Sequence, residues 1–213
     1  MIFHRSDSIR VSEIIEDIGG AKELPFIPES DARMKELLAL AIIGIECENS
    51  LWKAAQMPAF NSELRPQKRL GGRLGLPKGA VLPTVIVKDQ DLKPLQQWQS
   101  STGVPIHVWH SFYDRAYGLP LSRLEQLIAD GLIEPTVQVF QAPGGATTKK
   151  AIFKIYYHYA YELGMTIEEP QLVADSITDK NGHIMPYVRF SGGKMKILQT
   201  AINEVDAEAR AKK

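Results

Sequence analysis

The stretch IIGIECEN occupies residues 42–49 and alternates between two kinds of side chain. Ile43 and Ile45 share one face of an extended chain, and Glu46 and Glu48 share the other. This period of two predicts a β-strand that presents a pair of carboxylates on one face.

Helical and extended patterns alternate on both sides of residues 42–49. Helices are expected over residues 10–18, 31–40, 50–57, 92–99, 120–131, 150–163 and 195–205. Strands are expected over residues 83–87, 104–109, 135–140, 171–177 and 184–190, the last two joined by a hairpin turn at 179–182. The alternation predicts an α/β fold, with a central mixed β-sheet flanked by helices, in a single domain spanning residues 1–213.

Composition narrows the class of protein. The chain has 213 residues, 44% of them apolar, which is enough to bury one large core. It contains no run of eighteen apolar residues, and its start, MIFHRSDSIR, lacks the hydrophobic stretch of a secretory signal, so a cytoplasmic protein with no membrane partner is expected. Cys47 is the single cysteine, so any metal site needs oxygen or histidine ligands.

The charges balance overall but are unevenly distributed. No acidic residue occurs between Leu64 and Lys88, and further acid-free stretches span residues 135–161 and 180–203. The cations with which these stretches would contact phosphates are Arg65, Lys68, Arg69, Arg73, Lys78, Lys149 and Lys150. Such separation suits a protein that turns one face to a polyanion, although ordinary solvated surface explains each stretch taken alone.

The pair Glu46 and Glu48 has the chemistry of a metal site. Carboxylates two residues apart on a strand point to the same side and can bind one or two hard cations. A magnesium ion so held can activate water and stabilise charge on a phosphate under attack. A solvated sheet face would explain the glutamates equally well, but the strand is otherwise strongly apolar, and buried carboxylates need a compensating charge.

A family resemblance supports the nuclease interpretation. The segment IIGIECENSLWKA, the basic loop, PTVIVKD, the helix DLKPLQQW and VPIHVWHSF resemble the catalytic core of the PD-(D/E)XK nucleases, and more narrowly type II restriction endonucleases. In that superfamily a strand carries Glu-X-Lys, a helix follows, and another strand packs beside the first. The resemblance covers roughly residues 30–112 and leaves residues 113–213 for family-specific DNA-contacting or dimerisation elements.

The chain departs from the family's motif at two points. Glu48 stands where the lysine is usual, as it does in some restriction enzymes, so Lys53 or Lys88 could supply the missing cation, although an ordinary surface position explains each lysine better when it is taken alone. The family also needs an earlier acid. Asp31 is favoured over Glu29 and Glu36 because it lies at a chain reversal, although it would serve equally well as a helix cap.

Three other motifs carry weaker signals. The sequence Asp89-Gln90-Asp91 resembles a phosphatase nucleophile loop, but an acidic start to the next helix explains it better. His107 and His110 could pack or line a groove, and they lack the further ligands of a zinc site. The loop 142–150 precedes an expected helix whose N-terminus would contact DNA phosphates.

The sequence therefore predicts a Mg²⁺-dependent endonuclease that cuts double-stranded DNA. Asp31, Glu46 and Glu48 are the expected metal ligands, with Lys53 as a catalytic cation. A homodimer is expected because cutting both strands of a palindrome needs two active sites related by a two-fold axis. Two alternatives stay open: a Holliday-junction or repair nuclease of the same fold, and a catalytically inactive DNA-binding relative.

Overall fold

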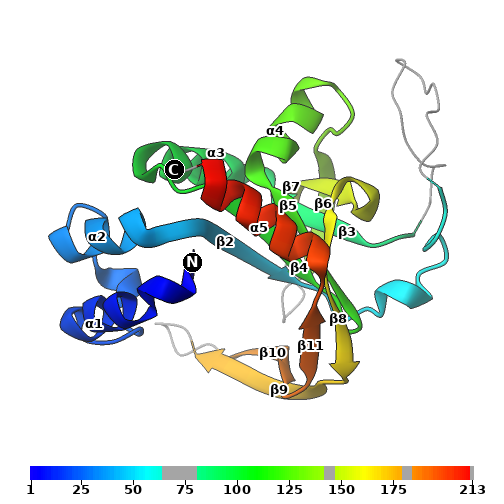
Figure 1. Ribbon diagram of the computed structural model, residues 1–213. Coiled ribbons are helices and arrows are strands. Elements are labelled where there is room, and N and C mark those ends of the chain that lie inside the picture. The colour runs from blue at the N-terminus through cyan, green and yellow to red at the C-terminus, as the bar shows by residue number, and fades with distance from the viewer. Residues whose placement is uncertain (64–80, 142–146, 179–183, 212–213) are drawn as a thin grey trace.

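The computed structural model of the chain describes residues 1–63, 81–141, 147–178 and 184–211 (Figure 1). The helices are α1 (Ser8–Ile18), α2 (Ala32–Leu40), α3 (Asp89–Thr102), α4 (Leu121–Ala129) and α5 (Gln199–Ala211). The strands are β1 (Ile2–Phe3), β2 (Ala41–Asn49), β3 (Thr84–Lys88), β4 (Ile106–Ser111), β5 (Arg115–Pro120), β6 (Thr136–Gln141), β7 (Thr147–Tyr156), β8 (Tyr161–Glu168), β9 (Gln171–Thr178), β10 (Ile184–Ser191) and β11 (Lys194–Ile197).

A curled mixed sheet of six strands forms the centre of the molecule, in the order β1-β2-β4-β5-β8-β11. The pair β2 and β4 is parallel, and every other pair in this sheet is antiparallel. The parallel pair is joined through α3, because parallel neighbours need a crossover connection. The predicted α/β class, with a mixed sheet and helices beside it, is confirmed.

One face of the central sheet packs against a second layer. That layer consists of α3, α4 and a three-stranded antiparallel sheet in the order β3-β7-β6. Its core includes Val85 of β3, Ile155 of β7, Val108 of β4, Leu119 of β5 and Leu124 of α4, all fully buried. This is the main hydrophobic core, and it lies on the same side of the sheet as Glu46 and Glu48.

The opposite face of the central sheet is covered by α5, as Figure 1 shows. Ala209 of α5 packs near Ile43 of β2, and Ala201 packs with Leu163 of β8. At the start of the chain, α1 and α2 form a third packed group around the fully buried Leu37. The strand β2 is thus covered on the Ile43 side, while its Glu46 side faces α3.

A buried polar network on the α5 side ties three elements together. The Trp109 indole donates a hydrogen bond to the Tyr161 hydroxyl at 2.8 Å, and that hydroxyl also lies 2.8 Å from Nδ1 of His107. The Glu208 carboxylate of α5 can only accept and lies 3.5 Å from Nε2 of His107. A neutral His107 ring therefore carries its proton on Nε2, and its Nδ1 accepts the proton of the Tyr161 hydroxyl. Burial lowers the pKa of His107, which fits a neutral ring. His107 therefore packs inside the protein, with the half-buried Trp109 beside it.

Two predicted helices are wrong. Residues 50–57 contain only a short 3-10 helix, Ala54–Gln56. Residues 150–163 form the end of β7, the 3-10 helix Tyr157–Tyr159 and the start of β8. Aromatic and β-branched side chains dominate this second segment, and such residues fit a pleated surface better than a helix.

The other expected helices and strands are present, most with small shifts of their ends. The helix expected at residues 195–205 begins only at Gln199 and continues to Ala211, and residues 195–197 belong to strand β11. The helix expected at residues 92–99 begins earlier, at Asp89, and ends at Thr102, where Gly103 follows in a left-handed conformation (φ 68°). Strands β9 and β10 pair as an antiparallel hairpin, as expected; the turn predicted at 179–182 lies outside the described residues. Within the described part of the chain, no helix is long and apolar enough to cross a membrane.

Candidate active site

Strand β2 places Glu46 and Glu48 on one face, as the alternation predicted. In the parallel ladder Glu46 lies beside Val108 of β4, and Glu48 lies beside His110. Both glutamates are half-buried. They therefore stand at the margin of the main core, where the strand leaves its buried half, Ala41–Gly44, and approaches solvent.

Gly44 lets α3 approach this face of β2. A Cβ atom at Gly44 would lie 3.0 Å from Cζ3 of Trp98, which is tighter than ordinary van der Waals contact. The Trp98 ring, Leu95 and Ile106 line a cavity of about 260 Å³ that also reaches Glu46. One wall of the candidate site is thus an apolar helix face packed directly on the carboxylate-bearing strand.

Lys88, the last residue of β3, brings a positive charge to the two glutamates. Its ammonium Nζ donates a hydrogen bond to Oε1 of Glu48 at 2.7 Å and lies 3.6 Å from the Asp91 carboxylate of α3. All three side chains are about one-third exposed or less, so this ion pair is partly shielded from water. The bond to Glu48 raises the pKa of Lys88, so the ammonium is charged at neutral pH.

Glu46 has an electrostatically unfavourable environment. Burial raises the pKa of its carboxyl, the negative charges of Glu48 and Asp91 raise it further, and Lys88 partly offsets them. No hydrogen bond or ion pair to the Glu46 carboxylate occurs among the described residues. A half-buried carboxylate with two acidic neighbours favours any cation that approaches it.

His110 lies beside Glu48 on the neighbouring strand β4 and is almost completely buried, at 2% exposure. Neither ring nitrogen has a hydrogen-bond partner within the described residues, and the ring stacks on Phe112 with centroids 4.7 Å apart. Burial lowers its pKa to about 4, so the imidazole is neutral at pH 7. A buried imidazole without a hydrogen-bond partner carries a desolvation cost of about 1–3 kcal/mol. Unsatisfied buried polar groups of this kind occur at functional sites.

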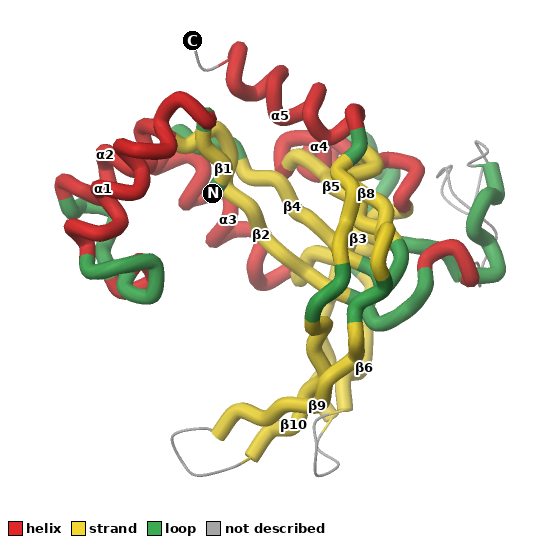
Figure 2. Tube along the Cα trace, turned by 60° about the horizontal axis from the view of Figure 1, so that its bottom comes forward, coloured by secondary structure: helices red, strands yellow, loops and turns green. Residues whose placement is uncertain are grey.

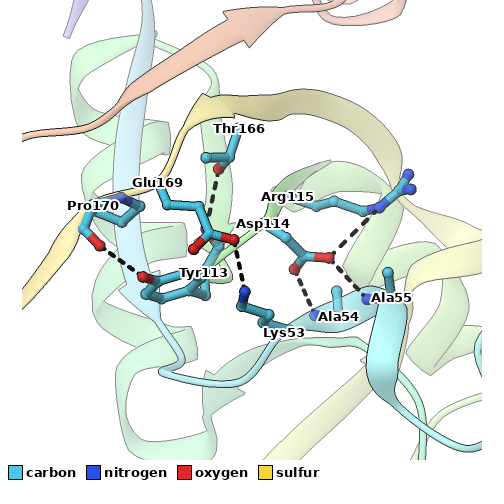
Figure 3. Close-up of polar contacts among 9 residues, drawn as sticks. All are labelled: Lys53, Ala54, Ala55, Tyr113, Asp114, Arg115, Thr166, Glu169 and Pro170. Atoms are coloured by element: carbon cyan, nitrogen blue, oxygen red, sulfur yellow. Dashed lines mark hydrogen bonds and ion pairs between the residues drawn. The ribbon is translucent and has the colours of Figure 1, made fainter.

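Lys53, expected as a catalytic cation, belongs to a different cluster (Figure 3). Its Nζ donates to the Glu169 carboxylate at 2.6 Å and lies 4.8 Å from the centre of the Tyr113 ring. Beside it, the Asp114 carboxylate accepts hydrogen bonds from the backbone N–H groups of Ala54 and Ala55. Of the two lysines considered from the sequence, the structure brings Lys88 to the glutamates and engages Lys53 elsewhere.

Asp31 lies at the far end of α2 from β2. It caps that helix: Oδ1 accepts from the backbone N–H of Arg33 at 2.9 Å, and the Arg33 guanidinium pairs with both carboxylate oxygens. These bonds lower the pKa of Asp31 to about 2. The nine residues of α2 alone separate it from the start of β2, a rise of about 13 Å. The structure does not bring Asp31 to Glu46 and Glu48.

The basic residues expected to contact DNA are only partly described. Arg65, Lys68, Arg69, Arg73 and Lys78 lie outside the described residues. Lys149 and Lys150 lie in β7, so the expected phosphate contact at a helix N-terminus is wrong. Neighbouring residues of a strand point to opposite faces; accordingly Lys149 is exposed and Lys150 is half-buried.

Across the described ranges, no group of three or more histidine, cysteine, aspartate or glutamate side chains is arranged to hold a metal ion. The carboxylates that do approach one another are Glu46, Glu48 and Asp91, with the Lys88 ammonium among them. Comparisons of the chain with protein-family models, with curated proteins and with solved structures found no match.

Sequence reasoning missed the roles of Asp91 and His110 at this site. The sequence predicts an acidic helix start at Asp91, and Asp91 does lie in the first turn of α3. Its position three residues after Lys88 was the available signal, because that spacing lets both side chains meet at a strand end. The contact of His110 with Glu48 depends on the register of β2 against β4, and the sequence alone does not give that register.

Proposed function

We propose that Glu46 and Glu48 bind a divalent metal ion, Mg²⁺ in the cell, and that the protein is a nuclease that hydrolyses phosphodiester bonds of double-stranded DNA. The observation that carries the proposal is the half-buried Glu46 carboxylate, whose pKa is raised by burial and by the neighbouring Glu48 and Asp91. A structural role would be better served by a paired or uncharged side chain at this position.

The donor set fits Mg²⁺. Carboxylate oxygens are its preferred protein ligands, and Mg²⁺ is commonly held by one or two carboxylates, with water and substrate phosphates completing its shell. Glu46 and Glu48 satisfy that requirement without a third acid, which accords with the separate location of Asp31. When bound, the ion would supply an activated water and stabilise negative charge on the phosphate.

Lys88 is assigned the part that lysine takes in the Glu-X-Lys motif. Its ammonium is already 2.7 Å from Glu48, so it holds that carboxylate in place and offers a fixed positive charge to a phosphate oxygen. Because Lys88 comes from β3, strand β2 can carry Glu48 at the position where the motif usually has lysine. The proposal does not assign this part to Lys53, because its Nζ pairs with Glu169.

The fold around the pair supports the restriction-endonuclease-like interpretation. The carboxylate strand β2, the helix α3 and the parallel strand β4 beside β2 follow the order that the motif resemblance implies. We include in the proposal the DNA contacts by the basic residues of segment 65–78 and by Lys149, and a homodimer that supplies two active sites for a palindromic target.

The test is incubation of the purified protein with supercoiled plasmid, duplex oligonucleotides and four-way junctions, with Mg²⁺ or with EDTA. Discrete plasmid fragments would support a restriction enzyme, and cleavage of junctions alone would support a structure-specific nuclease. Retardation of DNA in gels without cleavage would support an inactive DNA-binding relative.

Three variants connect the result to the site. Glu46→Gln and Glu48→Gln remove the proposed ligands and keep the shape of each side chain, so Mg²⁺-dependent cleavage should be lost. The control is Glu16→Gln, which makes the same chemical change on the exposed side of α1, far along the chain from β2. The protein with this substitution should cleave DNA at the wild-type rate. Cleavage that persists in Glu46→Gln at the rate of Glu16→Gln would refute the assignment.

A further inference from the structure

A cavity lies where β2, α3 and the start of the chain meet, three segments that Figure 2 shows close together. Its volume is about 260 Å³, and it is lined by the apolar side chains of Leu95 and Trp98 of α3 and Ile106 of β4. Pockets for drug-sized ligands measure roughly 300–1,000 Å³, so this cavity suits a smaller molecule. Its size and apolar walls fit a single ring with a short substituent.

Glu46 provides the polar end of this cavity. Gly44, which also lines it, lies two residues before Glu46, so both residues share the face of β2 that packs against Trp98. Among the described residues that line the cavity, only Glu46 has a charged side chain. The cavity thus combines apolar walls with one carboxylate.

The Glu46 carboxylate lacks the cation that its neighbour has. Glu48 is paired with Lys88 at 2.7 Å, whereas no hydrogen bond or ion pair to the Glu46 carboxylate occurs in the part of the chain that the structure describes. Burial raises the pKa of Glu46, and the charges of Glu48 and Asp91 raise it further. A half-buried anion in such surroundings is stabilised when a cation binds beside it.

The apolar walls of the cavity favour one kind of cation. Mg²⁺ gives up its water reluctantly, and aliphatic side chains such as Leu95 and Ile106 offer no hydrogen bonds to a water shell. An organic cation instead brings its own apolar body. A ring can pack on these side chains and on the Trp98 indole, while an ammonium or amidinium group donates hydrogen bonds to Glu46.

We infer that this cavity binds a small organic cation, a ring that carries an amine or amidine group, with Glu46 as the counter-ion. Binding of this kind needs no metal and no DNA, so it is independent of nuclease activity. One consequence rests on the proposed function: if Glu46 also binds a divalent ion, the organic cation and the ion compete for the same carboxylate. A molecule of this class would then inhibit the nuclease by displacing its metal.

Titration of the full chain with benzamidine tests the inference, at pH 7 with EDTA and without DNA. Binding is measured from the NMR shift of the Trp98 indole N–H, and the indoles of Trp52 and Trp109, which do not line the cavity, serve as internal controls. The expected dissociation constant is roughly 1 mM or tighter. Benzamide has the ring without the charge, and acetamidine has the charge without the ring. Both should bind roughly tenfold more weakly or worse.

Two variants connect binding to the carboxylate. Glu46→Gln removes the charge and keeps the shape of the side chain, so it should weaken benzamidine binding roughly tenfold or more. The matched control is Glu125→Gln, because Glu125 is also half-buried but lies on α4, where it accepts a hydrogen bond from Gln96. The protein with this substitution should bind benzamidine as the wild type does.

Three results would overturn the inference: no saturable shift of the Trp98 indole in the wild type, equal binding of benzamide and benzamidine, or equal binding of benzamidine by Glu46→Gln and the wild type. The comparison of probes uses the wild type alone, so it decides the question even if a variant folds poorly.

Mn²⁺ titration of the same protein separates this site from the proposed nuclease function. A wild type that binds benzamidine but no Mn²⁺ would refute the metal site and leave the cavity site in place. A wild type that binds Mn²⁺ but no benzamidine would overturn the cavity site alone. Where both bind, saturating benzamidine should weaken Mn²⁺ binding, and Mn²⁺ binding that benzamidine leaves unchanged would overturn the shared use of Glu46.

Discussion

Removal of the Tyr161 hydroxyl by Tyr161→Phe is expected to destabilise the protein without changing its shape. That oxygen accepts a hydrogen bond from the Trp109 indole and lies within hydrogen-bond distance of His107, both at 2.8 Å. His107 is fully buried, and burial raises the pKa of the Tyr161 phenol, which is therefore uncharged in the folded state. The change thus deletes two neutral hydrogen bonds from a buried site on the α5 face of the central sheet.

The magnitude follows from the partners left behind. A buried donor or acceptor without a partner costs about 1–3 kcal/mol, and this variant leaves one of each. The free energy of unfolding should therefore fall by about 2–4 kcal/mol. For a chain of 213 residues this corresponds to a fall in Tm of roughly 5–15 °C.

Urea denaturation followed by circular dichroism measures this change, with Tyr159→Phe as the matched control. Tyr159 is partly buried in the main core, and its hydroxyl makes no hydrogen bond to any residue that the structure describes. Its loss should cost less than about 0.5 kcal/mol. If Tyr161→Phe costs no more than Tyr159→Phe, the network does not stabilise the fold and the assigned proton positions are wrong.

Three further results are expected. Lys88→Met should lower the rate of DNA cleavage roughly hundredfold by removing a fixed positive charge, whereas Lys53→Met should cut at the wild-type rate; equal rates would contradict the choice of lysine. Glu46→Gln should melt at a higher temperature than wild type at pH 7 without metal. The folded pKa of Glu46 is raised, so ionisation destabilises the wild type as pH rises from 4.5 through the folded pKa; a melting difference that persists below pH 4 would contradict this cause. Gly118→Ala should cost about 1–3 kcal/mol or more, because its Cβ would overlap the Tyr161 ring, and urea denaturation equal to wild type would refute the close packing.

The carboxylate face of β2 could be predicted because local pattern decides it. Alternation from Ile42 to Asn49 places Glu46 and Glu48 together in any sheet, whatever the neighbours. The helices α1 and α2 were predictable for a similar reason, since Gly19 and Asp31 mark a helix end and a helix start in the sequence. These features depend on residues close together in the chain.

The errors lie where distant contacts decide the structure. Residues 50–57 have a helical pattern, yet their backbone N–H groups at Ala54 and Ala55 bond to Asp114, and the carbonyl of Trp52 accepts from Tyr113. The choice of Lys88 over Lys53 was likewise not derivable, because β3 pairs with β7 and reaches β2 only through the layered packing. Local periodicity carries no information about such partners.

Titration of Mn²⁺, followed by electron paramagnetic resonance, tests most directly whether the two glutamates bind a divalent ion. Mn²⁺ takes the same oxygen ligands as Mg²⁺ and reports binding without any DNA. Wild type and Asp31→Asn should bind Mn²⁺ alike, whereas the double variant Glu46→Gln with Glu48→Gln should lose that binding. Undiminished Mn²⁺ binding by the double variant, or its loss in Asp31→Asn alone, would contradict a metal site built from Glu46 and Glu48.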